Sequence, residues 1–158
     1  MTRLEFVLTG ITGLAIAIMP TAVVAQTSAR GVTGAAEAIF SNRATFNGVR
    51  LTGLTLGQGI FIATDGSATG QFQAVLLGTS ILGTPQNITV EGEVRNGSVG
   101  GDGSATISGT ATVSMGDGTL PTVGLPFTVM ASAQTLGLTL GVTALPPAAV
   151  TTGSITIE

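Results

Sequence analysis

Residues 88–115 read ITVEGEVR (88–95), NGSVGGDG (96–103) and SATISGTATVSM (104–115). In the first segment Ile88, Val90 and Val94 fall on one face of an extended chain, opposite polar and charged residues. In the third segment the apolar residues alternate with Thr and Ser in the same way, at Ala105, Ile107, Ala111, Val113 and Met115. Two arms with a period of two, joined by Asn-Gly and Asp-Gly, predict a half-buried antiparallel hairpin.

The remainder of the chain repeats this pattern less regularly. Asn47-Gly48 and Asp65-Gly66 predict turns between strands, because glycine tolerates the positive φ of tight hairpin turns. Residues 35–40 alternate like a strand but would also fit a turn of helix, and both interpretations stay open. Further strands are expected at residues 44–49, 51–56, 59–64, 71–77, 127–131, 136–142 and 155–157.

These segments predict an all-β domain, an antiparallel β-sandwich of about eight to ten strands. The alternative is a closed up-and-down β-barrel, in which closure removes the sheet edges. Prolines near positions 121, 126 and 146 favour the sandwich, because a proline cannot donate a hydrogen bond and marks an edge or a strand start. The motif Asp-Gly-Ser-Ala-Thr occurs at Asp65 and again at Asp102, which we interpret as one turn chemistry used twice.

The first 25 residues have the features of a secretory signal peptide. Arg3 and Glu5 precede an apolar run over residues 6–19, and Val23-Val24-Ala25 provides the small residues of a cleavage site. The run is shorter than the roughly 20 residues that a membrane-spanning helix needs. We therefore expect a signal peptide over 1–25, a flexible lead over 26–34 and a single all-β domain over 35–158. No membrane span is expected after removal of the signal.

Composition excludes several classes of function. The chain has five Lys or Arg residues, all of them Arg, and a net charge of −3. So few positive charges cannot form a basic stripe, so nucleic acid is not an expected partner. There is no cysteine, so disulfides cannot stabilise the domain. Low charge combined with 44% hydrophobic residues is the reverse of a disordered chain.

Catalytic chemistry is limited by the absence of His, Cys, Lys, Tyr and Trp. No Ser-His or Cys-His nucleophile can be assembled, and we predict no catalytic residue, no cofactor and no metal ligand set. Glu91 and Glu93 are the one close carboxylate pair, about 6 to 7 Å apart on one strand. That spacing is admissible for a glycosidase. A solvent-facing strand explains it more simply.

Two further groups of residues have competing interpretations. Asp65, Asp102 and Asp117 each precede a glycine, so ordinary turn geometry accounts for them, and calcium binding by these loops stays an open alternative. The five phenylalanines after the signal peptide are expected in the core rather than on a ligand platform: Phe40, Phe46, Phe61, Phe72 and Phe127.

The sequence thus favours a secreted or cell-surface β-domain without catalytic function. Its expected role is structural, adhesive or matrix-forming, with a homo-oligomer or a cell-surface component as the partner. The alternative function is a β-barrel or sandwich that binds a small apolar ligand in its interior. A carboxylate-based glycoside hydrolase using Glu91 and Glu93 is a distant third.

Overall fold

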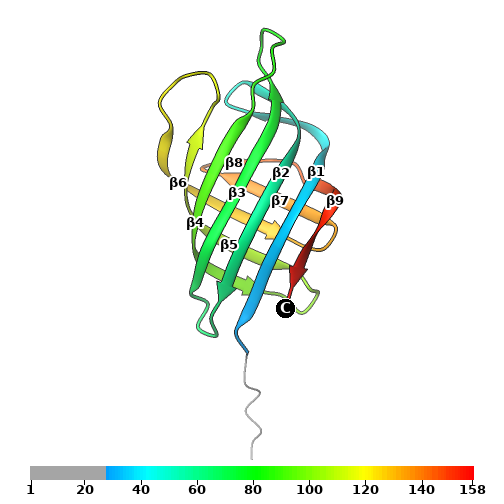
Figure 1. Ribbon diagram of the computed structural model, residues 1–158, viewed down its shortest axis with the longest axis vertical. Helices are drawn as coiled ribbons and strands as arrows, with labels where there is room; N and C mark the ends of the chain where they lie inside the picture. The colour runs from blue at the N-terminus through cyan, green and yellow to red at the C-terminus, as the bar shows by residue number, and fades with distance from the viewer. Residues whose placement is uncertain (1–27) are drawn as a thin grey trace, which may run out of the picture.

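The computed structural model describes residues 28–158, which form nine strands and no helix (Figure 1). Every pairing between these strands is antiparallel. The strands are β1 (Arg30–Phe46), β2 (Val49–Ile62), β3 (Ala68–Thr79), β4 (Ile88–Val99), β5 (Ala105–Ser114), β6 (Thr122–Ala131), β7 (Thr135–Leu140), β8 (Thr143–Ala144) and β9 (Ala148–Ile157).

The strands belong to one sheet that closes on itself. Consecutive strands pair from β1 to β7, β7 pairs with β9, and β9 returns to β1. In Figure 1, β1 to β4 form a front layer, and β5 to β7 cross behind it. The predicted all-antiparallel fold of eight to ten strands is confirmed. The ring of pairings and the two facing layers are compatible with both predicted forms, the sandwich and the barrel.

The hairpin over residues 88–115 is present as β4 and β5. Its turn, however, lies at residues 100–104, where Gly103 has a φ of +77°. A register shift between Val94 and Asn96 marks a bulge, after which Asn96 and Gly97 continue to pair with β5. A bulge inserts one unpaired residue and exchanges the two faces of the strand. The Asn-Gly dipeptide therefore belongs to the strand.

The first two strands are longer than the sequence pattern indicates. β2 joins the segments expected at residues 51–56 and 59–64, because its ladder with β1 and β3 continues past Gly57. Residues 35–40, left open between helix and strand, are part of β1. Residues 30–34 of the expected flexible lead also belong to β1, since they pair with β2 and, from Val32, with β9. The predicted signal peptide over 1–25 lies outside the described residues.

Inward-facing side chains from all the long strands pack into one core cluster. Within it the rings of Phe72 and Phe127 stack with their centroids 5.6 Å apart. Gly92 makes room for this pair, because a Cβ there would lie 2.8 Å from an atom of the Phe127 ring. The expected core position is confirmed for four phenylalanines and wrong for Phe61, which is 55% exposed on the outer face of β2.

The C-terminal strand is held in the sheet. β9 pairs with β1 from Ala148 to Ile157, and the Ile155 side chain is buried. A bulge at Thr151 and a positive φ at Gly153 interrupt its regular geometry. The chain end is thus part of the layer that covers the core.

One polar residue lies among the buried apolar side chains. Gln58 points inward from β2 with 8% of its surface exposed, and neither its amide nitrogen nor its amide oxygen has a hydrogen-bond partner. It lies opposite Phe72 on β3 and Gly34 on β1. Burial of an unpaired amide costs about 1 to 3 kcal/mol.

The substitution Gln58→Leu should therefore raise the free energy of unfolding by about 1 to 2 kcal/mol, because it removes the unpaired amide and keeps most of the volume. Urea denaturation measures this. Gln73→Leu, at an outward position of β3, is the matched control and should stay within about 0.5 kcal/mol of the parent. A loss of stability in Gln58→Leu would contradict the account of an unpaired amide.

Candidate functional site

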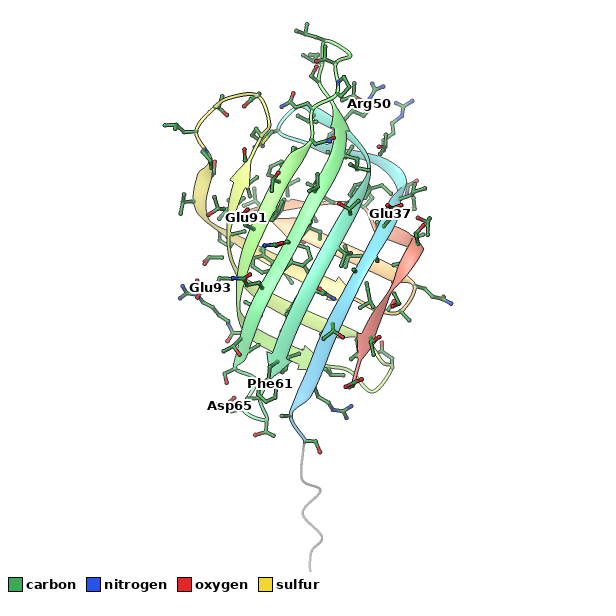
Figure 2. All side chains as sticks on the ribbon, viewed as in Figure 1. Glu37, Arg50, Phe61, Asp65, Glu91 and Glu93 are labelled. Carbon is green, nitrogen blue, oxygen red and sulfur yellow. The ribbon has the colours of Figure 1, made fainter. Side chains whose placement is uncertain are left out.

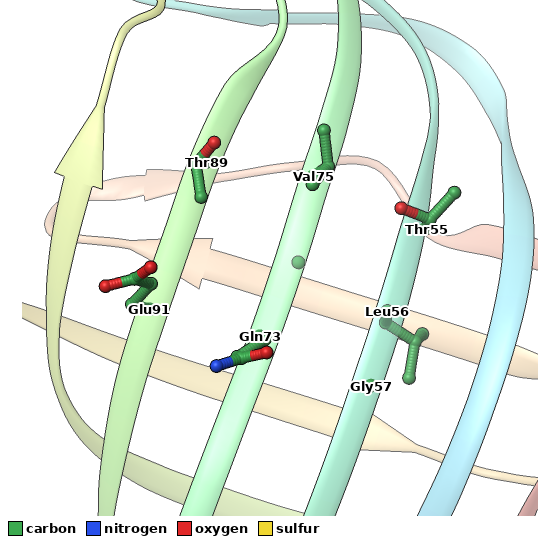
Figure 3. Close-up of a pocket in the computed structure, with 8 residues that line it drawn as sticks. Thr55, Leu56, Gly57, Gln73, Val75, Thr89 and Glu91 are labelled. Atoms are coloured by element: carbon green, nitrogen blue, oxygen red, sulfur yellow. The ribbon is translucent and has the colours of Figure 1, made fainter.

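A shallow hollow lies on the outer face of the front layer, over β2, β3 and β4 (Figure 3). It has a volume of about 210 Å³. Gly57 on β2, Gln73 on β3 and Glu91 on β4 lie side by side across it. The hollow exists because outward positions alternate with core positions, and because Gly57 has no side chain to fill the row. The polar groups that it offers are an amide, a carboxylate and two threonine hydroxyls.

Both members of the carboxylate pair point outward from β4, as Figure 2 shows. Glu91 faces Gln73 on β3 and Thr112 on β5, while Glu93 occupies the corresponding place one pair further along. Glu93 forms an ion pair with Arg95, at 3.8 Å between Oε2 and a guanidinium nitrogen, and both side chains are mostly exposed. The simpler interpretation, a solvent-facing strand, matches this position.

The arrangement supplies hydrogen-bonding groups on an open sheet surface. A second hollow of about 180 Å³ contains Glu91 and Glu93 together with two glutamines of β3. Glycosidases enclose one carboxyl group in an apolar pocket so that it stays protonated as the general acid. Neither glutamate is enclosed in this way, and the chain has no Trp or Tyr to stack against a sugar ring.

The three Asp-Gly dipeptides form three separate turns built from the same contacts. Oδ1 of Asp65 accepts hydrogen bonds from the amide of Ser67, at 2.9 Å, and from its hydroxyl, at 2.6 Å. Asp102 makes the same pair of contacts with Ser104, and Asp117 with Thr119. These hydrogen bonds, the hydroxyl first and the amide second, lower the pKa of each aspartate below its ordinary value of 3.8. Repeated turn chemistry is what the duplicated motif predicted.

Two kinds of feature are absent from residues 28–158. No three Asp or Glu side chains gather closely enough to hold a metal ion. No helix in this part of the chain is long and apolar enough to span a membrane.

Four connections meet at one end of the ring: residues 47–48, 80–87, 115–121 and 141–142. The Gln86 side-chain amide donates to the backbone oxygen of Met115 at 2.9 Å, which ties the second connection to the third. A hollow of about 160 Å³ is lined by Asn47, Met115 and Val142, which places the first, third and fourth connections beside one another. We call these four segments the loop end. Figure 1 shows the loop between β3 and β4 projecting furthest from it.

Aliphatic side chains project from the loop end into solvent, which the sequence analysis did not predict. Ile81 and Leu120 are each 93% exposed, Leu82 and Val142 are also exposed, and Val123 is exposed nearby at the start of β6. The signal was present in the sequence, because Ile81-Leu82 and Leu120 lie beside Gly, Pro and Asp in segments that composition assigns to loops.

The ring has an open edge along β9. β7 pairs with β9 only at Ala148 and Ala149, and Val150 donates one further hydrogen bond to Gln134. Beyond Val150, no described strand pairs with the edge of β9 that faces away from β1. Figure 1 shows β9 at the margin of the front layer.

Comparisons with protein-family models, with curated proteins and with solved structures find no match to this chain. Inference about function therefore depends on the surfaces described above.

The turn contacts lead to a test by titration. Ser67→Ala removes the hydroxyl donor, the largest cause of the lowered pKa of Asp65, so that pKa should rise toward 3.8 while that of Asp102 stays unchanged. Because the folded pKa lies below the unfolded value, these contacts stabilise the fold above about pH 3.8 and lose their effect as pH falls through the folded pKa. Carboxyl-carbon NMR titration measures both aspartates. An unchanged Asp65 would show that the hydroxyl does not set its pKa.

Proposed function

We propose that the protein is a secreted or cell-surface structural module without catalytic function, and that it self-associates through the open edge of β9. Export is supported by the signal-peptide pattern of residues 1–25. The observation that carries self-association is the unpaired edge of β9 beyond Val150.

The orientation of backbone groups along β9 follows from its ladder with β1. Gly31 and Glu158 exchange both backbone hydrogen bonds, at 3.3 and 2.9 Å. Hydrogen-bonded and non-hydrogen-bonded pairs alternate in an antiparallel ladder. The N–H and C=O groups of Gly153, Ile155 and Ile157 therefore point away from β1, toward the open side. They form a row of donors and acceptors suited to another strand.

The side chains of β9 do not protect this edge. Natural sheets discourage edge pairing with charges, especially Lys, and with proline. β9 carries neither, and its outward side chains from 151 to 156 are Thr, Gly and Ser. A second copy of β9 is the partner that fits, since two identical edges pair antiparallel around a twofold axis.

The two other expected functions have less support. An interior ligand site needs roughly 300 to 1,000 Å³ of open space, whereas the inward side chains of this domain pack into one core cluster. The hydrolase alternative depends on Glu91 and Glu93, which lie on an open face. Neither arrangement favours these functions over association.

The substitution pair Ser154→Lys/Thr156→Lys tests the proposal. Both side chains are exposed on the outer face of β9, and antiparallel pairing would place like charges from two copies across from each other, which disfavours pairing. The parent should associate with rising concentration in sedimentation velocity, and the variant should stay monomeric with an unchanged far-ultraviolet circular dichroism spectrum.

Glu91→Gln/Glu93→Gln is the matched control, because it changes the net charge by the same amount and sign at the same spacing on a central strand. It should associate like the parent. A parent that stays monomeric at all accessible concentrations, or a lysine variant that associates equally well, would refute the role of β9.

A further inference from the structure

We propose that the loop end is a membrane-docking surface that inserts its aliphatic tips into a bilayer containing anionic lipid. This proposal is independent of self-association through β9, because it concerns a different part of the ring. It starts from the exposed aliphatic side chains of three separate connections: Ile81 and Leu82, Leu120, and Val142.

The connections bearing these side chains are held together. The Gln86 to Met115 hydrogen bond joins the second connection to the third. A groove of about 520 Å³ lies between the first and second connections, with Gly48 and Ile81 among the residues that line it. The connection that bears Ile81 and Leu82 is therefore tied by a hydrogen bond to the connection that bears Leu120, at the same end of the molecule.

The opposite end has a contrasting chemistry. Its turns are Ala-Thr-Asp-Gly-Ser over residues 63–67 and Gly-Gly-Asp-Gly-Ser over 100–104, with no aliphatic residue larger than alanine. The Gly97 amide donates to the Gly66 backbone oxygen at 3.0 Å, so β4 meets the first turn at this end. Figure 2 shows Arg50 and Asp65 at opposite ends of the molecule. Exposed aliphatic residues thus gather where the loops project furthest.

The charges near the loop end favour an anionic membrane surface as its binding partner. Arg43 and Arg50 flank the 47–48 turn, and the one ion pair in the described part of the chain joins Glu93 to Arg95. The guanidinium groups of Arg43 and Arg50 therefore have no carboxylate partner among residues 28–158. Asp117 is the one acidic residue in the four connections, whereas Asp65, Asp102 and Glu158 lie toward the other end. Together, the loop end and these two flanking arginines carry two positive charges and one negative charge, in a chain whose net charge is −3.

The shape and residue types favour a bilayer over a protein partner. Protein interfaces draw most of their affinity from Trp, Tyr and Arg anchors that fill pockets. The tips are Ile, Leu and Val on narrow projecting loops, and the four connections contain no aromatic residue. Peripheral membrane binding needs apolar groups that reach past the headgroups and nearby positive charge, and each added methylene strengthens it. Both requirements are met at this end.

The absence of cysteine allows a test of orientation. Single substitutions Leu82→Cys, Leu120→Cys and Gly101→Cys, each labelled with the fluorophore NBD, report which end enters the bilayer. The protein is used as isolated, with the same N-terminus in every variant as defined by intact mass. With phosphatidylcholine–phosphatidylglycerol vesicles, labels at 82 and 120 should shift to shorter emission wavelengths and be quenched by spin-labelled lipid, and the label at 101 should stay as in buffer.

Binding strength provides a second readout, by vesicle sedimentation. Ile81→Ser/Leu120→Ser should lower partitioning at least tenfold, because two buried aliphatic groups are lost. The control Phe61→Ser/Met130→Ser removes two exposed apolar side chains from other faces and should change it less than twofold. Arg43→Gln/Arg50→Gln should lower, by about tenfold, the ratio of partitioning into anionic vesicles to partitioning into phosphatidylcholine vesicles.

Three results would overturn the proposal. One is the absence of binding to either vesicle. Another is an emission shift at position 101 but not at 82 or 120. It would show that the opposite end, where β1 begins, enters the bilayer. The third is that Ile81→Ser/Leu120→Ser associates less than the parent in sedimentation without vesicles. This would show that the tips mediate contact between copies of the protein.

Discussion

The structure depends on closing a long sheet around an apolar interior. Each strand has one face that must leave water and two edges whose backbone groups need partners. A flat sheet of these strands would bury neither its apolar face nor its outer edges. The pairings of β6 with β7, and of β7 with β9, bring the two ends of the sheet together. Without disulfides and with few charges, the ladder and the core are the main sources of stability.

Closure requires the sheet to bend, and bulges and glycines interrupt the regular geometry of several strands. Extra residues shift the register in β1, β2, β4, β6 and β9. Gly109 lies on the inner side of β5, where a Cβ would meet the backbone oxygen of Glu93 and the ring of Phe127. Gly92 gives the same ring its space from β4. Small residues inside the strands thus let the layers approach and the large aromatic rings fill the centre.

The sequence predicted the features that depend on local alternation. The arms of the β4–β5 hairpin, the Asn47-Gly48 turn and the Asp-Gly turns follow from the apolar period of two and from turn chemistry. The sequence did not predict where a bulge would exchange the faces of a strand. The turn after β4 therefore lies at residues 100–104. Asn96 and Gly97 instead pair with β5 as part of the strand, which the local sequence could not indicate.

The surfaces that carry the proposals were harder to predict for a different reason. Phe61 was assigned to the core because phenylalanine is usually buried, but its parity along β2, between Ile60 and Ile62, places it outside. The open edge of β9 cannot be inferred from β9 itself. It exists because β7 is only six residues long and pairs with β9 at just two residues, Ala148 and Ala149. The loop end likewise arises only when hairpins from distant parts of the chain gather at one end.

The two proposed surfaces constrain each other geometrically. β9 runs from the loop end, where Ala148 pairs with Phe40, toward the opposite end, where Ile157 pairs with Val32. Antiparallel pairing of two β9 edges would therefore point the two loop ends in opposite directions. Such a dimer could not place both sets of aliphatic tips in one bilayer, but it could hold two surfaces together. Self-association and membrane docking through these surfaces would thus combine into a bridging function, which fits a structural or adhesive module better than either surface does alone.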